Sequence, residues 1–130
     1  FQNVREKASL AYYAFSRLEK NKGLMLISSG IEFNNKNKTL GIINQQLDDI
    51  CQGRISDYEF DSTIKSLVNS FKEAADNPSM IISLYLDGII NGMQISTEEI
   101  IKNLYKVTKE DVINVAQKVN LDTVFFLNEK

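Results

Sequence analysis

The chain opens with Phe1-Gln2-Asn3-Val4-Arg5-Glu6-Lys7-Ala8-Ser9-Leu10-Ala11-Tyr12-Tyr13, a stretch whose apolar pattern changes from helical to extended. Phe1, Val4 and Ala8 recur at helical spacing and predict one apolar helix face. No Ser, Thr, Asp or Asn precedes them as an N-cap. We therefore expect the helix to begin upstream, in a longer protein from which this chain is cut. From Ala11 onward β-prone residues predict a strand.

The expected strand over residues 11–18 is followed by a second β-prone run over residues 24–33. The residues between them, Glu19-Lys20-Asn21-Lys22-Gly23, favour a turn. Two such runs joined by a short turn predict an antiparallel hairpin. A third short apolar strand, Thr123-Val124-Phe125-Phe126-Leu127, is expected near the end of the chain.

Further segments have helical periodicity. We expect helices over residues 40–51, 57–76, 78–90, 97–105 and 109–119, after a polar loop over residues 34–38. Two of them begin at the capping-box sequences Ser56-Asp57-Tyr58-Glu59 and Ser96-Thr97-Glu98-Glu99. The helix over residues 78–90 is apolar around most of its circumference, which predicts a central position.

The predicted fold class is α+β, with a small antiparallel sheet of about three strands covered by four or five helices. We expect residues 1–130 to form a single domain. Three strands are few for this much helix, so we expect strands from an N-terminal, missing part to complete the sheet.

The composition is that of an ordinary globular protein, with 43% hydrophobic and 25% charged residues among 130. The net charge of -2 and the lack of a basic stripe argue against nucleic-acid binding. The longest apolar stretch, residues 80–90, contains Ser83, Asp87 and Gly88 and is too short to span a bilayer. Cys51, the single cysteine, excludes an internal disulfide and favours a reducing, cytoplasmic location.

The sequence lacks histidine, which excludes a Ser-His-Asp triad, a Cys-His dyad and an imidazole metal site. The glycines are scattered singly, so a glycine-rich phosphate loop is also excluded. The acidic pairs Asp48-Asp49 and Glu98-Glu99 lie on predicted helices, where adjacent side chains diverge by roughly 100°. We expect no catalytic residue and no metal ligand in this chain.

Arg5 and Tyr12 are the candidate substrate-binding residues. Arg5 lies at the end of a predicted helix and Tyr12 at the start of a strand, so a chain reversal could bring their polar tips to one side. A guanidinium can hold a carbonyl or carboxylate, and a phenol can donate a hydrogen bond to a developing oxyanion. The alternative is that Arg5 is a surface charge and that the tyrosines pack with their hydroxyls at the rim. Tyr13 would face away from Tyr12, because neighbouring strand residues alternate.

The opening segment resembles the F-x-x-x-R-E-K-x-x-L-A-Y signature of the M16 (pitrilysin/insulinase-like) zinc peptidases. The resemblance continues along essentially the whole chain. Its further pieces are Gly23–Glu32, Ile55–Phe60 (similar to I-S-x-x-E-L), Val107–Val112 (similar to V-T-x-E-D-V) and Thr123–Leu127.

Within the family, the chain is most similar to the C-terminal domain of a bacterial M16B member, a LuxS/MPP-like α+β domain. The resemblance implies a clamshell of paired halves around a peptide-holding chamber. Zinc would be bound by an H-x-x-E-H helix and a distal glutamate in the N-terminal half. That motif is absent here, so zinc is expected in the full-length protein or in a partner subunit.

The resemblance also implies that Arg5 and Tyr12 contact the peptide backbone and the reacting carbonyl. The implied partners are a peptide substrate and an N-terminal M16 domain, either of the same chain or of a partner subunit in a homo- or hetero-oligomer. Family members that have lost zinc carry the same R-E-K-x-x-L-A-Y segment, which therefore marks the fold better than the activity.

Three functions stay open at this point. The first is the non-zinc half of an M16 metallopeptidase that processes peptides, and the second is a catalytically inactive scaffold or partner subunit. The third is an unrelated α+β binding module. An H-x-x-E-H motif upstream of this chain would favour the first.

Overall fold

The computed structural model describes residues 10–92 and 96–128. The helix expected at the start of the chain, and Arg5 with it, lie outside these residues. The chain forms two compact units, one made of residues 1–52 and 116–130 and the other of residues 53–115. Each unit is described by itself below.

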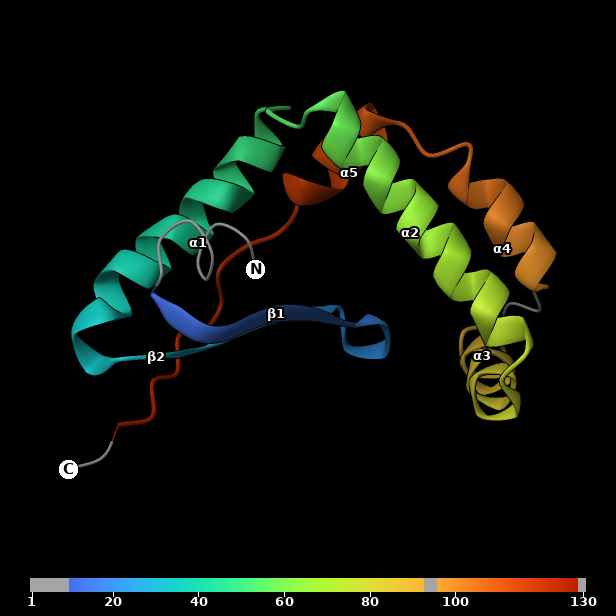
Figure 1. The fold of residues 1–130 in the computed structure, drawn as a ribbon, viewed down its shortest axis with the longest axis horizontal. Helices are drawn as coiled ribbons and strands as arrows, with labels where there is room; N and C mark the ends of the chain where they lie inside the picture. Colours follow the sequence, from blue (N-terminus) through green and yellow to red (C-terminus); the bar gives the residue numbers. More distant parts are fainter. Residues whose placement is uncertain (1–9, 93–95, 129–130) are drawn as a thin grey trace. The chain divides into compact units, whose positions relative to one another are not determined.

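The first unit contains a β-hairpin. Strand β1 (Ala11–Glu19) pairs antiparallel with β2 (Leu24–Ile31), as the sequence predicts (Figure 1). The turn is a single 3₁₀ turn over Lys20–Lys22 that ends at Gly23, whose φ of 62° lies in the left-handed region that favours glycine. The Gly23 N–H donates to the Lys20 carbonyl at 3.2 Å and closes the turn.

The third predicted strand is wrong for the part of the chain that the structure describes, where the sheet has two strands. Residues 123–127 make no strand ladder there. A strand is defined by a hydrogen-bonded partner strand, and residues 123–127 have none among the described residues. The segment is instead held by Phe126, whose ring lies 5.9 Å from the Phe33 ring and 5.0 Å from the Lys36 ammonium. The α+β class itself is confirmed.

Helix α1 (Lys36–Cys51) follows the hairpin after a 3₁₀ turn over Phe33–Asn35. The polar loop expected over residues 34–38 is therefore wrong, because the 3₁₀ turn runs directly into the helix. The N-cap is Asn35, a residue type favoured at that position, but its side chain makes no capping bond here. The Gln117 side chain donates to the Cys51 carbonyl at 3.2 Å, which ties the residue that follows position 116 to the end of α1.

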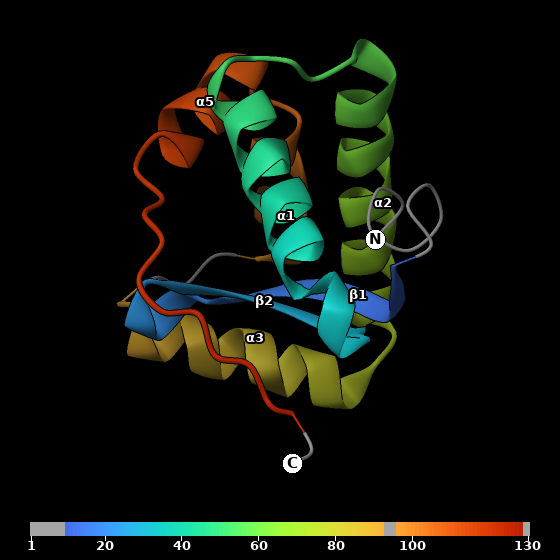
Figure 2. The same cartoon turned by 90° about the vertical axis from the view of Figure 1, so that its left-hand side faces the viewer.

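The second unit is helical. It contains α2 (Asp57–Ala75), α3 (Pro78–Ile90), α4 (Thr97–Leu104, labelled in Figure 1) and most of α5 (Lys109–Ala116) (Figures 1 and 2). None of the helices within the described residues has both the length and the apolar content needed to cross a bilayer.

Local capping determines where these helices begin. The Ser56 hydroxyl accepts a hydrogen bond from the Glu59 N–H at 3.2 Å, and the Ser56 N–H donates to the Glu59 carboxylate at 3.0 Å. This reciprocal pair is the predicted capping box of α2. Asn77 caps α3 through its side chain, with Pro78 in the first turn as predicted.

The core of the second unit lies along α2, where Val68 is 2% and Ala74 is 1% exposed. Helix α2 packs against both α3 and α4. The central position predicted for α3 is wrong, since Ile82, Tyr85, Ile89 and Ile90 are each 60–68% exposed. One face of α3 meets α2, and within the described residues nothing covers the other apolar side chains. Periodicity shows that a helix face is apolar but not what lies against it.

Lys109, at the start of α5, links two helix starts. Its ammonium donates to the Ile55 carbonyl at 2.8 Å and to the Asp57 carboxylate at 2.7 Å. The hydrogen bond from Lys109, together with its positive charge, lowers the pKa of Asp57 below its usual value.

Replacing Ser56 with alanine should remove the hydroxyl that accepts the Glu59 N–H, while the backbone N–H of residue 56 can still donate to the Glu59 carboxylate. The change should destabilise the protein by about 1 kcal/mol, the usual cost of losing an N-cap. Urea unfolding of the native protein would measure this loss. Ser66→Ala, at an exposed mid-helix position of α2, is the matched control and should cost nothing. Equal stability of Ser56→Ala and the wild type would contradict the role of the cap.

The Asp57–Lys109 pair predicts a small pH dependence of stability. Because the folded pKa of Asp57 is lowered, its contribution is present above the unfolded value of 3.8 and is lost as the pH falls through the folded value. Asp57→Asn should therefore be less stable than the wild type near neutral pH, and the difference should shrink as the pH falls below about 4. Since Asp57 is solvent-exposed, the effect should also weaken in high salt. A stability difference that grows toward acid pH would be incompatible with the pair.

Candidate functional site

Tyr12, the candidate substrate-binding residue that the structure describes, lies at an irregularity in β1. Ala11 pairs with Ile31 and Tyr13 pairs with Gly30, so two steps along β1 match one step along β2. Tyr12 is the extra residue of a β-bulge. Bulges bend the strand and re-aim a side chain, and they occur often beside functional sites.

Tyr12 is 72% exposed, and Tyr13, although 49% exposed, makes several packing contacts. The Tyr13 ring stacks on Phe15 at 6.1 Å with an interplanar angle of 25°. It also lies over Gly30, where an added Cβ would meet ring atom Cε1 at 2.3 Å. The Ser29 hydroxyl donates to the Tyr13 carbonyl at 3.0 Å. The structure therefore gives Tyr13 a packing role and presents the Tyr12 phenol to solvent.

The sequence prediction separated the two tyrosines by strand alternation, which does not apply across a bulge because the extra residue breaks the period. Packing against Gly30 and Phe15 is what distinguishes them. Arg5 lies outside the described residues, so the pairing of Arg5 with Tyr12 stays a prediction. A glycine within a predicted strand, here Gly30, is the sequence signal that could have indicated a bulge or a close approach at this point.

The residues of this chain do not fit the zinc site that the family resemblance implies for the complete protein. The sequence has no histidine to supply an imidazole ligand, and it has one thiol. Among the described residues, no three Cys, Asp or Glu side chains gather closely enough to hold a metal ion. No step of a metal-dependent reaction can therefore be assigned to these residues.

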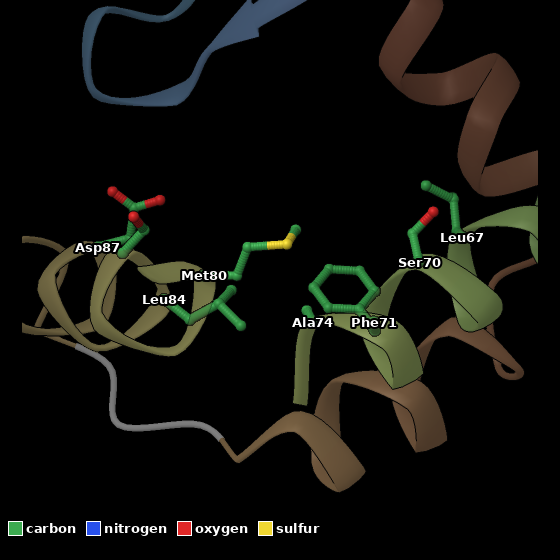
Figure 3. Close-up of a pocket in the computed structure, with 8 residues that line it drawn as sticks. Leu67, Ser70, Phe71, Ala74, Met80, Leu84 and Asp87 are labelled. Atoms are coloured by element: carbon green, nitrogen blue, oxygen red, sulfur yellow. The ribbon is translucent and has the colours of Figure 1, made fainter. Parts of the chain in front are cut away.

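A second candidate site is a pocket of about 270 Å³ between α2 and α3, inside the second unit (Figure 3). It is lined by two helical stripes: Leu67, Ser70, Phe71 and Ala74 from α2, and Met80, Ser83, Leu84 and Asp87 from α3. Sequence analysis predicted both helices and missed the pocket. The signal was the same i, i+3, i+4, i+7 spacing in two neighbouring helices, which places each stripe on one face.

The family model described as "Peptidase M16 inactive domain" matches residues 1–67. A protein of Bacillus subtilis (strain 168) named "Probable inactive metalloprotease YmfF" is 38% identical over 127 residues, which cover 98% of this chain and 30% of that protein. The chain thus spans about a third of the length of this relative.

Two solved structures share the fold. A conserved protein from Enterococcus faecalis V583 matches with a TM-score of 0.80 and 34% identity, over 90% of this chain and 28% of its own. A protease from Helicobacter pylori matches with a TM-score of 0.70 and 16% identity, over 90% of this chain and 29% of its own. At 16% identity the second match shows the fold alone.

Gly30→Ala should destabilise the hairpin by about 1–3 kcal/mol, as overpacking does, because the new methyl group would displace the Tyr13 ring. Chemical denaturation of the native protein would measure this change. Gly41→Ala is the matched control, since a Cβ there meets nothing within 4 Å. In the interior of α1 it should stabilise by about 0.5–1 kcal/mol. If Gly30→Ala left the stability unchanged, the packing of the Tyr13 ring would not require a glycine at position 30.

Proposed function

We propose, from the premise that this chain belongs to the family of M16 peptidase inactive domains, that it is the non-zinc, peptide-holding C-terminal part of an M16-type metallopeptidase. In this proposal it forms one wall of the chamber in which a peptide is bound. Because the chain spans about a third of its B. subtilis relative, the activity belongs to the complete protein.

The observation that carries the proposal is the exposed Tyr12 phenol on a bulged strand of the matched region. A phenol that faces solvent can donate its O–H to the carbonyl oxygen of a bound peptide. If that carbonyl is the one attacked, the same bond strengthens as negative charge develops on the oxygen. Tyr12 would then bind the peptide in the ground state and stabilise the transition state.

The division of labour follows from the side chains present. This chain lacks the histidines of an H-x-x-E-H site, so zinc would be held by an N-terminal M16 domain of the same chain or by a partner subunit. Assembly with such a partner, as a homo- or hetero-oligomer, is part of the proposal, as is a cytoplasmic location. The role of the present residues is to bind and orient the peptide.

A second candidate function is a catalytically inactive scaffold or partner subunit. The name of the B. subtilis relative, which describes that protein as a probable inactive metalloprotease, favours it. Both functions include peptide binding at Tyr12, and they differ in whether the complete protein holds zinc and cleaves. Zinc content and chelator-sensitive cleavage of a fluorogenic peptide mixture by the full-length protein separate them.

Tyr12→Phe in the full-length protein removes one hydroxyl and little else. If the protein cleaves peptides, kcat should fall by about 10²–10³, the typical cost of losing an oxyanion donor. If it does not cleave, peptide affinity should fall by about twofold to tenfold, the cost of one neutral hydrogen bond. Fluorogenic cleavage and fluorescence anisotropy measure the two effects.

Tyr58→Phe, which removes another largely exposed phenol, from α2, is the control and should change neither quantity. Unchanged turnover and unchanged peptide affinity in Tyr12→Phe would sink the proposed role of this residue.

A further inference from the structure

The pocket between α2 and α3 is an apolar cleft with one charged side chain, Asp87, in its lining. Phe71 of α2 and Met80 of α3 extend toward one another across the opening, with Ala74 and Leu84 beside them (Figure 3). These four side chains give the cleft an apolar surface. A ligand group that enters it must therefore be apolar as well.

The polar side chains of the lining fall into two classes. The two serines are satisfied by their own helices, because Ser70 Oγ donates to the Ser66 carbonyl at 3.1 Å and Ser83 Oγ donates to the Ser79 carbonyl at 3.0 Å. An apolar ligand can cover these two hydroxyls without breaking their hydrogen bonds. Asp87 differs: it is exposed, and its carboxylate makes no hydrogen bond or ion pair with the residues that the structure describes.

Asp87 is also the single charged residue of the lining and of the α3 sequence Pro78–Ile90. A ligand whose apolar group occupies the cleft would therefore meet one uncompensated negative charge at its edge. A positively charged group on the ligand complements that charge, and a negatively charged group is repelled.

The volume narrows the choice of ligand. An apolar cavity of about 150 Å³ already accepts benzene, whereas pockets for whole drug-sized molecules run from about 300 Å³ upward. At about 270 Å³ the cleft has the size for one large apolar side chain, aromatic or aliphatic.

We propose that this cleft binds a bulky apolar side chain of a peptide and that Asp87 pairs with a cationic group next to it, either a Lys or Arg side chain or a peptide amino terminus. The proposal rests on the proposed peptide-holding function and names its peptide class: apolar residues with an adjacent positive charge. The charge complementarity at Asp87 selects this occupant over a neutral or acidic one.

Two small probes test the cleft in the full-length protein. Phenethylamine and phenylacetate carry the same ring with opposite charges, and ligand-observed NMR titration measures the affinity of each. We expect phenethylamine to bind about twofold to fivefold more tightly, the range given by one exposed ion pair. Asp87→Asn should remove this preference and Asp87→Lys should reverse it.

Two further variants place the binding. Leu84→Trp should fill the cleft and abolish binding of both probes, whereas Asp61→Lys, a charge reversal at an exposed position of α2 outside the cleft, should leave the preference intact. A lack of phenethylamine binding, or a preference unaffected by Asp87→Lys, would overturn the proposal.

The same variants separate this inference from the proposed function. If peptide binding is sensitive to Tyr12→Phe but not to Asp87→Lys or Leu84→Trp, the proposed peptide-holding function stands. The proposal that the cleft binds the peptide side chain is then wrong. Charge-selective binding of phenethylamine without any peptide binding would keep the cleft as an amine-binding site and overturn the function. In the expected case, a peptide with adjacent Phe and Lys binds more tightly than one with adjacent Phe and Glu, and Asp87→Lys reverses that order.

Discussion

The register of the β1–β2 hairpin decides which face each hairpin side chain lies on and where Tyr12 is presented. A two-stranded ribbon has little stability of its own, and a slip of one residue would move every side chain to the opposite face. The Tyr13 ring over Gly30 resists such a slip, because a different partner residue would place a Cβ where the ring lies. The stack on Phe15 and the bond from Ser29 act in the same direction. The bulge that presents Tyr12 exists only in this register.

Features that depend on residues within about one helical turn of each other could be predicted from the sequence. The capping box of Ser56 and Glu59, Pro78 in the first turn of α3 and the termination of α1 before Gly53 each depend on residues a few positions apart. The interactions that stabilise these features are made between residues within that span, so the local sequence is enough to predict them. The hairpin belongs with them, because its turn residues and flanking β-prone runs are adjacent in the chain.

Features that depend on a distant partner could not be predicted. Residues 123–127 have strand composition, but a strand forms through a ladder, and here Phe126 contacts Phe33 instead. Helix α3 has the composition of a buried helix, yet its burial depends on which surfaces pack against it. The cleft follows the same rule: the two stripes could be read from spacing, but the space between them depends on the packing of α2 against α3.

In the described part of the segment that carries the family resemblance, residues 10–13, packing explains every residue except Tyr12. Leu10 is buried, at 8% exposed, and Ala11 is half-buried, so the fold accounts for both. Tyr13 is accounted for by Gly30 and Phe15. Tyr12 lies between them, largely exposed and without a comparable contact in the described residues. A change at Tyr12 should therefore have little effect on stability, so any effect on peptide binding or turnover reports contact with the ligand. The same change at Tyr13 would mix both effects, and this makes Tyr12 the position at which function can be separated from fold.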